Sequence, residues 1–540
     1  MSVSHHGGDE RVMARTIVPS LYPIRMAPSP DGRFVAYTFG RDLLLAPIET
    51  TADSTILPHS LGTSPLVRLS PGLDPRWDTD GQLAWTSGNH VYRSDPARAL
   101  QLGKPVSATR RIGDAPPVVA PNSIVKVPLV VARAKPRGII ALVGARAITM
   151  KDDKVLDSAT IVITDDRITA IGPVGLVRIP RGARVVDVRG KTIMPGIVDL
   201  HAHYDWQWHE SMIRPRWELL ANLAYGVTSS REVSGSPHQL ATAELIETGE
   251  LIGPRLFGVA TAVNPPKFRL DSYDDAKAVV DHLKRLGVVV VKQYDQPTAV
   301  QRQWVIEASR EAGLNVTGHN PIDMIRGGGT GFEHWVPTDA VYDDVATVLA
   351  ATGIWLTPTH LGTPSTNPMA GAHSLYRDNK YRRFVPQTQI DERHRTAALP
   401  ASRAGNTALI DRVSSTRRIV KRGGHVTIGS HGDYPGIGAH WEIWALYHGG
   451  FSALDALRAG TLDGARGLGV EQDLGSLERG KLADLLVLDG DPLAKIENTS
   501  LLRYVMKNGF MYAGETLEME WPTKKRLPSW MYQQRPGEAR

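Results

Sequence analysis

The sequence contains no cysteine among its 540 residues. Disulfides, thiolate metal sites and cysteine nucleophiles are therefore excluded, and any metal must be held by histidine, a carboxylate or a modified lysine. No run of about 18 apolar residues is present, so no transmembrane helix is expected. Residues 1–15 are polar and lack the apolar stretch of a secretory signal, which makes cytoplasmic residence the default expectation.

An excess of charge of one sign is also missing. Lys and Arg number 62 against 56 Asp and Glu, which leaves a net charge of +6 spread over 540 residues. No basic run is long enough to suggest a nucleic-acid arm, so we expect neither a nucleic-acid nor a membrane partner. Hydrophobic residues make up 42% and charged residues 22%, an ordinary composition for a folded protein. The length predicts more than one domain.

The first part of the chain, residues 21–118, predicts an all-β segment. Asp31-Gly32 and Asp80-Gly81 each precede a pair of short apolar strands, which is a hairpin signal. The two units lie about 45 residues apart, the spacing of propeller blades. Because a propeller needs about 4–8 blades to close, this segment must pack on the main body or on another subunit, or serve as a protein-binding module. Residues 1–20 are expected to be a tail, and residues 119–136, rich in Pro and Val, a linker.

Residues 196–465 alternate between strand and helix patterns. This alternation predicts an α/β architecture, a (β/α)₈ TIM-like barrel, with a doubly wound open sheet as the alternative. Residues 137–195 and 466–515 predict a flanking β-sandwich domain, and residues 516–540 a C-terminal tail. The strand candidates of the barrel are 196–201, 226–230, 256–261, 287–292, 314–319, 331–335, 353–358 and 425–430.

Histidines and one lysine stand at the ends of several of these strands. His201 and His203 are two residues apart, so they face the same side of the first strand. Lys292 ends the apolar fourth strand, where it needs either a carboxylate partner or conversion to an N6-carboxylated ligand that bridges two metals. His319 and His334 end the fifth and sixth strands. The H-x-H pair alone is weak evidence, but the full set predicts a site for Zn²⁺ or a similar divalent ion.

The motifs "PGIVDLHAHYD", "KQYD", "GHN" and "GFEHW", with the tail "AGTLDGARGLGVEQDLGSLERGKLADLLVLDGDPL", resemble the amidohydrolase superfamily. The resemblance covers residues 137–515 and is strongest to the imidazolonepropionase and prolidase-like branch, including the hydrolase half of TolB-propeller fusions. It implies hydrolysis of a C–N bond in an amide, peptide-like or cyclic amide substrate by a metal-activated water. It also implies that His201, His203 and Lys292 hold one metal, and that Lys292, His319 and His334 hold a second.

The eighth strand departs from the family pattern. Where the family usually has Gly-Thr-Asp or Gly-Ser-Asp, this chain reads "VTIGSHGDYPGIGAHWE", with His431 at the aligned position and Asp433 two residues later. Strand alternation would turn both side chains the same way, so either could be the catalytic proton shuttle. His440 is a weaker candidate, for which a structural role is the alternative.

Substrate contacts are predicted less sharply. Arg231, Tyr294 and Tyr204 are the candidates to contact substrate, and for Arg231 a salt bridge at the barrel mouth is an equal alternative. The loop 360–395 carries basic and aromatic side chains at 376–384 that would clamp an acidic or aromatic substrate, or simply form a surface.

Two rival hypotheses remain beside the metal-dependent amide hydrolase. One is a deaminase or cyclic-imine hydrolase that uses one metal on the same barrel, with Lys292 unmodified. The other is a catalytically inactive scaffold. We expect a small-molecule or peptide-like substrate and assembly as a homo-oligomer.

Overall fold

The structure is a computed structural model of the 540-residue chain. It divides into two compact units, residues 1–130 with 262–314 and residues 131–261 with 315–540, and each is treated separately below. The predicted tail 1–20, loop residues 362–374 and the last part of the C-terminal tail lie outside the described residues. No helix in the described part of the chain is long and apolar enough to cross a bilayer. The described residues are 26–39, 42–48, 67–69, 73–87, 89–103, 119–128, 130–204, 216–235, 238–265, 268, 270–334, 341–361, 375, 377–397 and 403–527.

The N-terminal part of the first unit contains two four-stranded antiparallel sheets. One buried cluster draws on both sheets, with Phe34, Leu45 and Leu69 from the first and Trp85 and Tyr92 from the second. Part of the predicted linker is strand β8, which extends the second sheet. The elements are β1 (Met26–Pro28), β2 (Phe34–Phe39), β3 (Asp42–Pro47), β4 (Val67–Leu69), β5 (Leu73–Trp77), β6 (Leu83–Ser87), β7 (His90–Ser94), α1 (Pro96–Leu102) and β8 (Ser123–Lys126).

The same unit includes helix α4 (Tyr273–Arg285), strand β17 (Val290–Gln293) and helix α5 (Ala299–Glu311). Both helices begin at capping boxes, with Ser272 and Thr298 as the N-cap residues. Helix α4 meets the N-terminal sheets through a buried ion pair, in which Arg68 Nη1 lies 2.9 Å from Asp275 Oδ1. Ser87 Oγ and His282 Nδ1 form a second buried link of 2.9 Å. The N-terminal sheets therefore pack on helix α4 within the first unit.

The second unit carries seven of the eight predicted barrel strands in parallel register. Strands β14 (Ile197–Ala202), β15 (Val227–Glu232) and β16 (Arg255–Gly258) form one sheet. Strands β18 (Asn315–Gly318), β19 (Gly331–Glu333), β20 (Trp355–Thr357) and β21 (His425–Val426) pair in chain order.

Backbone hydrogen bonds join these two runs of strands. Leu200 N donates to Ile428 O, and His431 N donates to His201 O, so β14 pairs with the segment that follows β21. These bonds connect the two runs of strands, together called the parallel array below. The remaining predicted strand, the fourth, is β17 of the other unit. An α/β fold with parallel strands is confirmed, whereas closure into an eight-stranded barrel stays a prediction.

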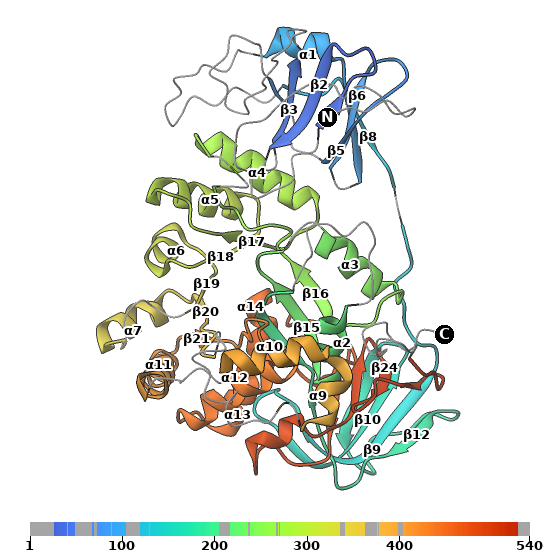
Figure 1. Ribbon diagram of the computed structural model, residues 1–540. Helices are drawn as coiled ribbons and strands as arrows, with labels where there is room; N and C mark the ends of the chain where they lie inside the picture. Colours follow the sequence, from blue (N-terminus) through green and yellow to red (C-terminus); the bar gives the residue numbers. More distant parts are fainter. Residues whose placement is uncertain are drawn as a thin grey trace. The chain divides into compact units, whose positions relative to one another are not determined.

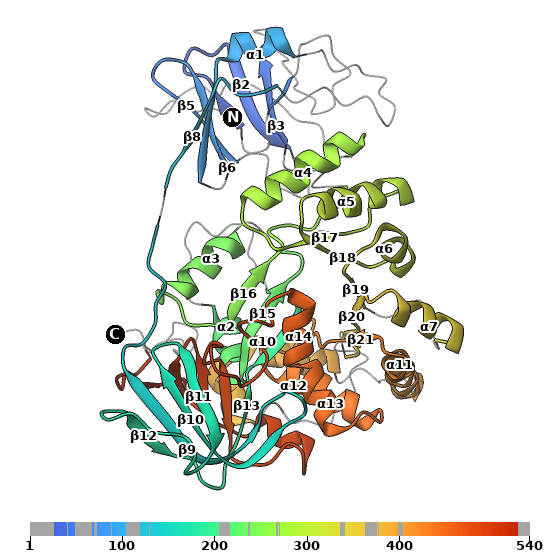
Figure 2. The ribbon, with the colours of Figure 1, turned by 180° about the vertical axis from the view of Figure 1, so that it is seen from behind.

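Helices follow most of the strands of this array, and α12, α13 and α14 lie together beside it in Figure 2. Helices α9 and α10 occupy the long loop after β20. The second unit's main helices are α2 (Trp217–Ala224), α3 (His238–Glu247), α6 (Pro321–Gly327), α7 (Asp343–Ala351), α9 (Asn379–Phe384), α10 (Gln387–Ala397), α11 (Arg403–Lys421), α12 (Ile437–His448), α13 (Ala453–Ala459) and α14 (Leu462–Leu468).

The prediction of a substrate clamp at residues 376–384 is wrong for Lys380, Tyr381 and Phe384, whose side chains are buried. Tyr381 and Phe384 are buried in the core cluster that contains Trp441, and Lys380 is buried beside Tyr225. The reason is amphipathic spacing on α9, which turns residues 380, 381 and 384 inward and leaves Arg382 and its neighbour exposed.

A nine-stranded mixed sheet flanks the parallel array, and Figure 1 shows its cyan and red strands side by side. The sequence predicts a sandwich from these segments. Hydrogen bonding instead links them into one sheet, because β13 pairs with β9 on one side and with β22 on the other. Strand β25 shows that the predicted C-terminal tail is partly built into the sheet. The strands are β9 (Ile139–Ile148), β10 (Val155–Thr164), β11 (Arg167–Pro173), β12 (Arg184–Asp187), β13 (Thr192–Pro195), β22 (Leu485–Leu488), β23 (Leu502–Lys507), β24 (Phe510–Ala513) and β25 (Met519–Trp521).

Candidate metal centre

The first two predicted ligands converge at the end of β14. His201 is fully buried and His203 is half-buried, and their Nε2 atoms lie 3.1 Å apart. Two neutral imidazoles at this distance need either a shared proton or a cation between their lone pairs. Their approach is the geometric result expected of alternate residues on one strand.

Three further histidines gather around this pair. The ring of His334 lies 4.5 Å from that of His201 and 4.8 Å from that of His319, measured between centroids. The ring of His431 lies 4.7 Å from that of His203 and 5.2 Å from that of His201. The structure thus brings together five of the six predicted histidines that belong to the second unit, and the sixth, His440, lies elsewhere.

Hydrogen-bond and ion-pair partners restrain the Nδ1 side of four of these rings. His203 Nδ1 lies 2.9 Å from Ser234 Oγ, and His334 Nδ1 lies 2.8 Å from Thr359 Oγ1. His201 Nδ1 faces Glu333 at 3.4 Å, and His431 Nδ1 faces Asp433 at 2.9 Å. Oxygen partners at Nδ1 fix ring orientation and leave Nε2 as the coordinating atom, the usual arrangement of metal-binding histidines.

The three rings of His201, His203 and His431 offer nitrogen atoms that all lie within 4.8 Å of one another. Imidazole nitrogen is a preferred donor for zinc and similar divalent ions. The donor set therefore fits a divalent metal, and a single ion can be reached by these three side chains.

The backbone at this site adopts unusual conformations. His334 has φ 63° and His431 has φ 61°, both in the left-handed region that L-residues rarely adopt. Gly432 follows with φ 88°, and a side chain at this position would collide with the backbone of His203. Strain of this kind persists where the surrounding structure enforces it, commonly at functional sites.

The turn after His431 corrects the prediction that His431 and Asp433 face the same way. Strand β21 ends at Val426, so strand alternation no longer applies at these positions. Only His431 joins the ring cluster, and Asp433 Oδ2 lies behind it at Nδ1. The backbone carbonyl of Asp433 also accepts a hydrogen bond from Arg393 of helix α10. Asp433 is therefore placed to orient His431.

Sequence reasoning missed the buried carboxylates around the cluster. Asp199 accepts hydrogen bonds from the backbone N–H groups of His201 and Ser430, each at 3.1 Å, and from Ser430 Oγ at 2.5 Å. It thereby ties β14 to the segment before His431, and burial raises its pKa. Its position two residues before His201 on the same strand was the signal that could have revealed it.

Arg231 occupies the alternative role considered for it. Its Nη2 donates to Glu333 Oε1 at 2.8 Å and its Nε donates to Leu200 O at 2.7 Å, and the side chain is 4% exposed. Burial lowers the pKa of Arg231 to about 10, with the carboxylate of Asp199 acting in the opposite direction. The guanidinium is committed to these partners, which speaks against a direct substrate contact.

Tyr204 is also placed away from an open site. Its side chain is buried in a small apolar cluster with Leu219, Ile246 and Leu256, which does not support the predicted substrate contact. Its backbone N–H donates to Glu232 Oε2 at 2.6 Å.

Lys292 and Tyr294 belong to the first unit. Lys292 is 1% exposed at the end of β17, and its Nζ lies 5.7 Å from the ring centroid of the half-buried Tyr294. The two side chains therefore share one face of the strand end, as their spacing predicts.

His440 has a structural role, the alternative considered for it from the sequence. Its two ring nitrogens lie 3.0 Å from Thr499 Oγ1 and 2.7 Å from Tyr225 O, inside the core of the second unit. Burial lowers its pKa to about 3.

Comparison with known proteins identifies the family of this chain. The sequence pattern of the amidohydrolase family matches residues 192–511. The chain belongs to the amidohydrolase family. It is therefore an enzyme of the hydrolases that act on carbon–nitrogen bonds.

Two characterised relatives of this amidohydrolase are similar over most of their own length. Imidazolonepropionase of Symbiobacterium thermophilum is 25% identical over 382 residues, covering 63% of this chain and 85% of the relative. 5-Methylthioadenosine/S-adenosylhomocysteine deaminase of Moorella thermoacetica is 25% identical over 384 residues, covering 62% of this chain and 82% of the relative.

Solved structures share the fold. A Xaa-Pro dipeptidase with methionine in its active site superposes with a TM-score of 0.54 at 20% identity, covering 70% of this chain and 100% of that one. Molinate hydrolase superposes with a TM-score of 0.56 at 17% identity, covering 75% and 99%. At these identities the likeness establishes the amidohydrolase fold alone.

Proposed function

We propose that this amidohydrolase cleaves an amide, peptide-like or cyclic amide bond in a small molecule, with a divalent metal, zinc, held by the histidine cluster. The observation that carries the proposal is the convergence of His201, His203 and His431, whose nitrogen atoms lie within 4.8 Å of one another. The oxygen partners at Nδ1 support it, because they turn Nε2 of each ring toward the others.

Each residue has a proposed role. His201 and His203 hold the metal, and His319 and His334 hold a second ion where two are present. When bound, the metal supplies Lewis-acid activation of water and of the scissile carbonyl. His431 accepts and returns the proton, a role that histidine commonly has in general acid–base catalysis. Asp433 keeps the His431 ring oriented through Nδ1, at 2.9 Å.

Lys292 is the proposed N6-carboxylated ligand between two metals. Its near-complete burial at a strand end supports this role, because a buried ammonium is costly and N6-carboxylation would replace it with a metal-binding carboxylate. A ¹³C signal from labelled bicarbonate that appears in the wild type and is missing in Lys292→Ala would support carboxylation. Full metal content and turnover in Lys292→Ala would refute it.

A deaminase or cyclic-imine hydrolase with one metal is the second candidate. Two observations favour it: His201, His203 and His431 offer nitrogen atoms that a single ion can reach, and His431 stands where the family pattern has Asp. Relatives include both an imidazolonepropionase and a nucleoside deaminase, so the two candidates have similar support from sequence. The TolB-fusion resemblance of the N-terminal sheets, homo-oligomeric assembly and the closed barrel remain parts of the proposal.

One experiment separates these candidates from each other and from an inactive scaffold. Metal content is measured for the wild type, for His203→Asn and for His448→Asn, a matched control at an exposed histidine outside the cluster. We expect metal in the wild type and the control and a large loss in His203→Asn. Turnover is then screened with N-acyl amino acids, Xaa-Pro dipeptides, imidazolonepropionate and 5-methylthioadenosine. Ammonia and free amine are followed separately, and ring opening of imidazolonepropionate is followed as loss of the substrate. Ammonia release alone favours the deaminase, and equal metal content in all three proteins contradicts the proposed centre.

A further inference from the structure

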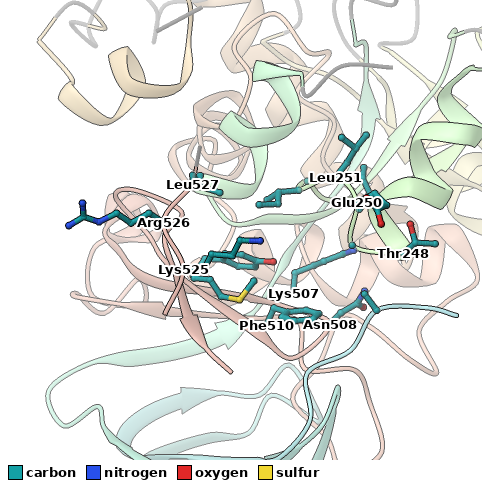
Figure 3. Close-up of a pocket in the computed structure, with 16 residues that line it drawn as sticks. Thr248, Glu250, Leu251, Lys507, Asn508, Phe510, Lys525, Arg526 and Leu527 are labelled. Carbon is teal, nitrogen blue, oxygen red and sulfur yellow. The ribbon is translucent and has the colours of Figure 1, made fainter. Parts of the chain in front are cut away.

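A cavity with a volume of about 400 Å³ lies in the same unit as the histidine cluster. It opens between the loop that follows α3, residues 248–253, and the hairpin strands β23–β25, as Figure 3 shows. It shares no lining residue with the histidine cluster. Its size falls at the small end of the range for ligand pockets.

The walls of this cavity are mainly apolar. Leu251 and Ile252 come from the loop, and Phe510, Met519 and Leu527 come from the strands and their continuation. Apolar walls with a few polar groups are the usual composition of a small-molecule site. An occupant therefore needs a compact apolar body.

Two lysines give the cavity a cationic character. Lys507 is 5% exposed, and its Nζ donates one hydrogen bond, to Glu247 Oε1 at 2.8 Å. An ammonium group has three N–H donors, so two remain for a ligand. Lys525 lines the opposite part of the cavity, and Arg526 points away from it (Figure 3).

The carboxylate of Glu247 is shared among several cations. Arg133 approaches it at 2.9 Å and Arg255 at 2.8 Å, and these arginines also lie near Asp166 and Asp484, at 3.7 and 3.4 Å. Burial, and then the charge of Arg255, lowers the pKa of Lys507 to about 8. An additional anion beside Lys507 would stabilise its ammonium form. The negative charge of Glu250 at the rim repels an incoming anion.

We propose that this cavity binds a small organic monocarboxylate with an aromatic or branched apolar body. Its carboxylate contacts Lys507, its apolar body packs between Leu251 and Phe510, and Lys525 adds a positive charge at the opposite part of the cavity. The site is independent of the metal centre and of the proposed hydrolysis.

The test uses 2-naphthoate as the probe and 2-naphthalenemethanol, its uncharged analogue, as the control ligand, in titration calorimetry on the full chain. We expect the acid to bind at least about tenfold more tightly than the alcohol, the difference that one charge-assisted contact provides. Leu251→Trp fills the cavity and should abolish binding while metal content is unchanged. This variant locates the probe, because binding at the metal centre would survive it.

Two single-charge variants at the rim sharpen the test. Lys525→Gln should weaken binding of 2-naphthoate about three- to tenfold, and Glu250→Gln should strengthen it by a similar factor. Both side chains are exposed, so neither change should affect folding. Equal affinity for acid and alcohol, unchanged binding in Leu251→Trp, or no binding up to millimolar probe would each overturn the proposal.

Discussion

The ion pair between Glu333 and Arg231 provides the sharpest prediction about the metal centre. Glu333 is completely buried on β19, with one carboxylate oxygen 2.8 Å from Arg231 Nη2 and the other 3.4 Å from His201 Nδ1. The perturbation is Glu333→Gln, which keeps the shape of the side chain and removes its charge. The neutral side chain leaves the buried Arg231 without its carboxylate and presents an amide where His201 Nδ1 needs an acceptor.

Two separate magnitudes follow from this geometry. Removing one partner of a buried ion pair costs ~3–5 kcal/mol, and the lower end applies because Asp199 still favours the charged guanidinium. Loss of the carboxylate that orients a metal-binding histidine lowers metal affinity roughly 10- to 100-fold. We therefore expect a lower melting temperature together with weaker zinc binding.

The assay pairs thermal unfolding of the metal-free protein with zinc titration against a competing chelator. The double variant Arg231→Met with Glu333→Gln removes both charges, so it should recover most of the stability. It should not recover zinc affinity, because His201 still lacks its carboxylate. Wild-type zinc affinity in Glu333→Gln would refute the positioning role. Recovery of both properties in the double variant would show that Glu333 acts only by balancing charge.

Three further outcomes are expected. Asp433→Asn should keep most of the bound metal but lower kcat roughly 10- to 100-fold by releasing the His431 ring, which turnover and metal content measured side by side would check; unchanged kcat would contradict it. Burial lowers the pKa of Lys380 to about 8 from its ordinary 10.5, so the folded state loses this proton first and unfolding free energy should rise as pH increases between these values. Lys380→Met should increase the free energy of unfolding by roughly 1–3 kcal/mol at pH 7 and abolish its rise with pH. Chemical denaturation at several pH values checks both, and a variant less stable than the wild type at pH 7 would disprove the reasoning. Arg68→Met should destabilise the first unit by ~3 kcal/mol, because Asp275 then stays buried without the arginine. The same substitution at an exposed arginine, Arg382→Met, should cause no such loss.

The strand positions were predictable from the sequence because each buried parallel strand is a short run of β-branched and apolar residues. The approach of His201 and His203 was predictable for a related reason, because strand alternation at the end of β14 turns both side chains the same way. Prediction failed where the chain leaves regular structure. His431 and Asp433 were assigned one face because a strand was assumed, but a left-handed turn separates them.

Pairings between distant segments were the other limit. Nothing local in the sequence indicates that Glu333 pairs with Arg231 or that β13 joins β9 to β22. The basic character of α9 likewise suggested a substrate clamp, because a buried lysine is rare and cannot be recognised without its apolar surroundings. Such contacts depend on tertiary packing, which a single sequence does not encode in a readable pattern.

The contact between helix α4 and the N-terminal sheets has a consequence for how this chain can change. Asp275, Val279 and His282 form one buried stripe on α4, and Arg68 and Ser87 cover its two polar members. The family match starts at residue 192, so the helix lies inside the matched region while the residues that cover it lie outside. The hydrolase segment of this chain cannot be exchanged for that of a shorter relative without resurfacing α4. We accordingly expect the residues at positions 68 and 275 to change together among proteins that share both segments.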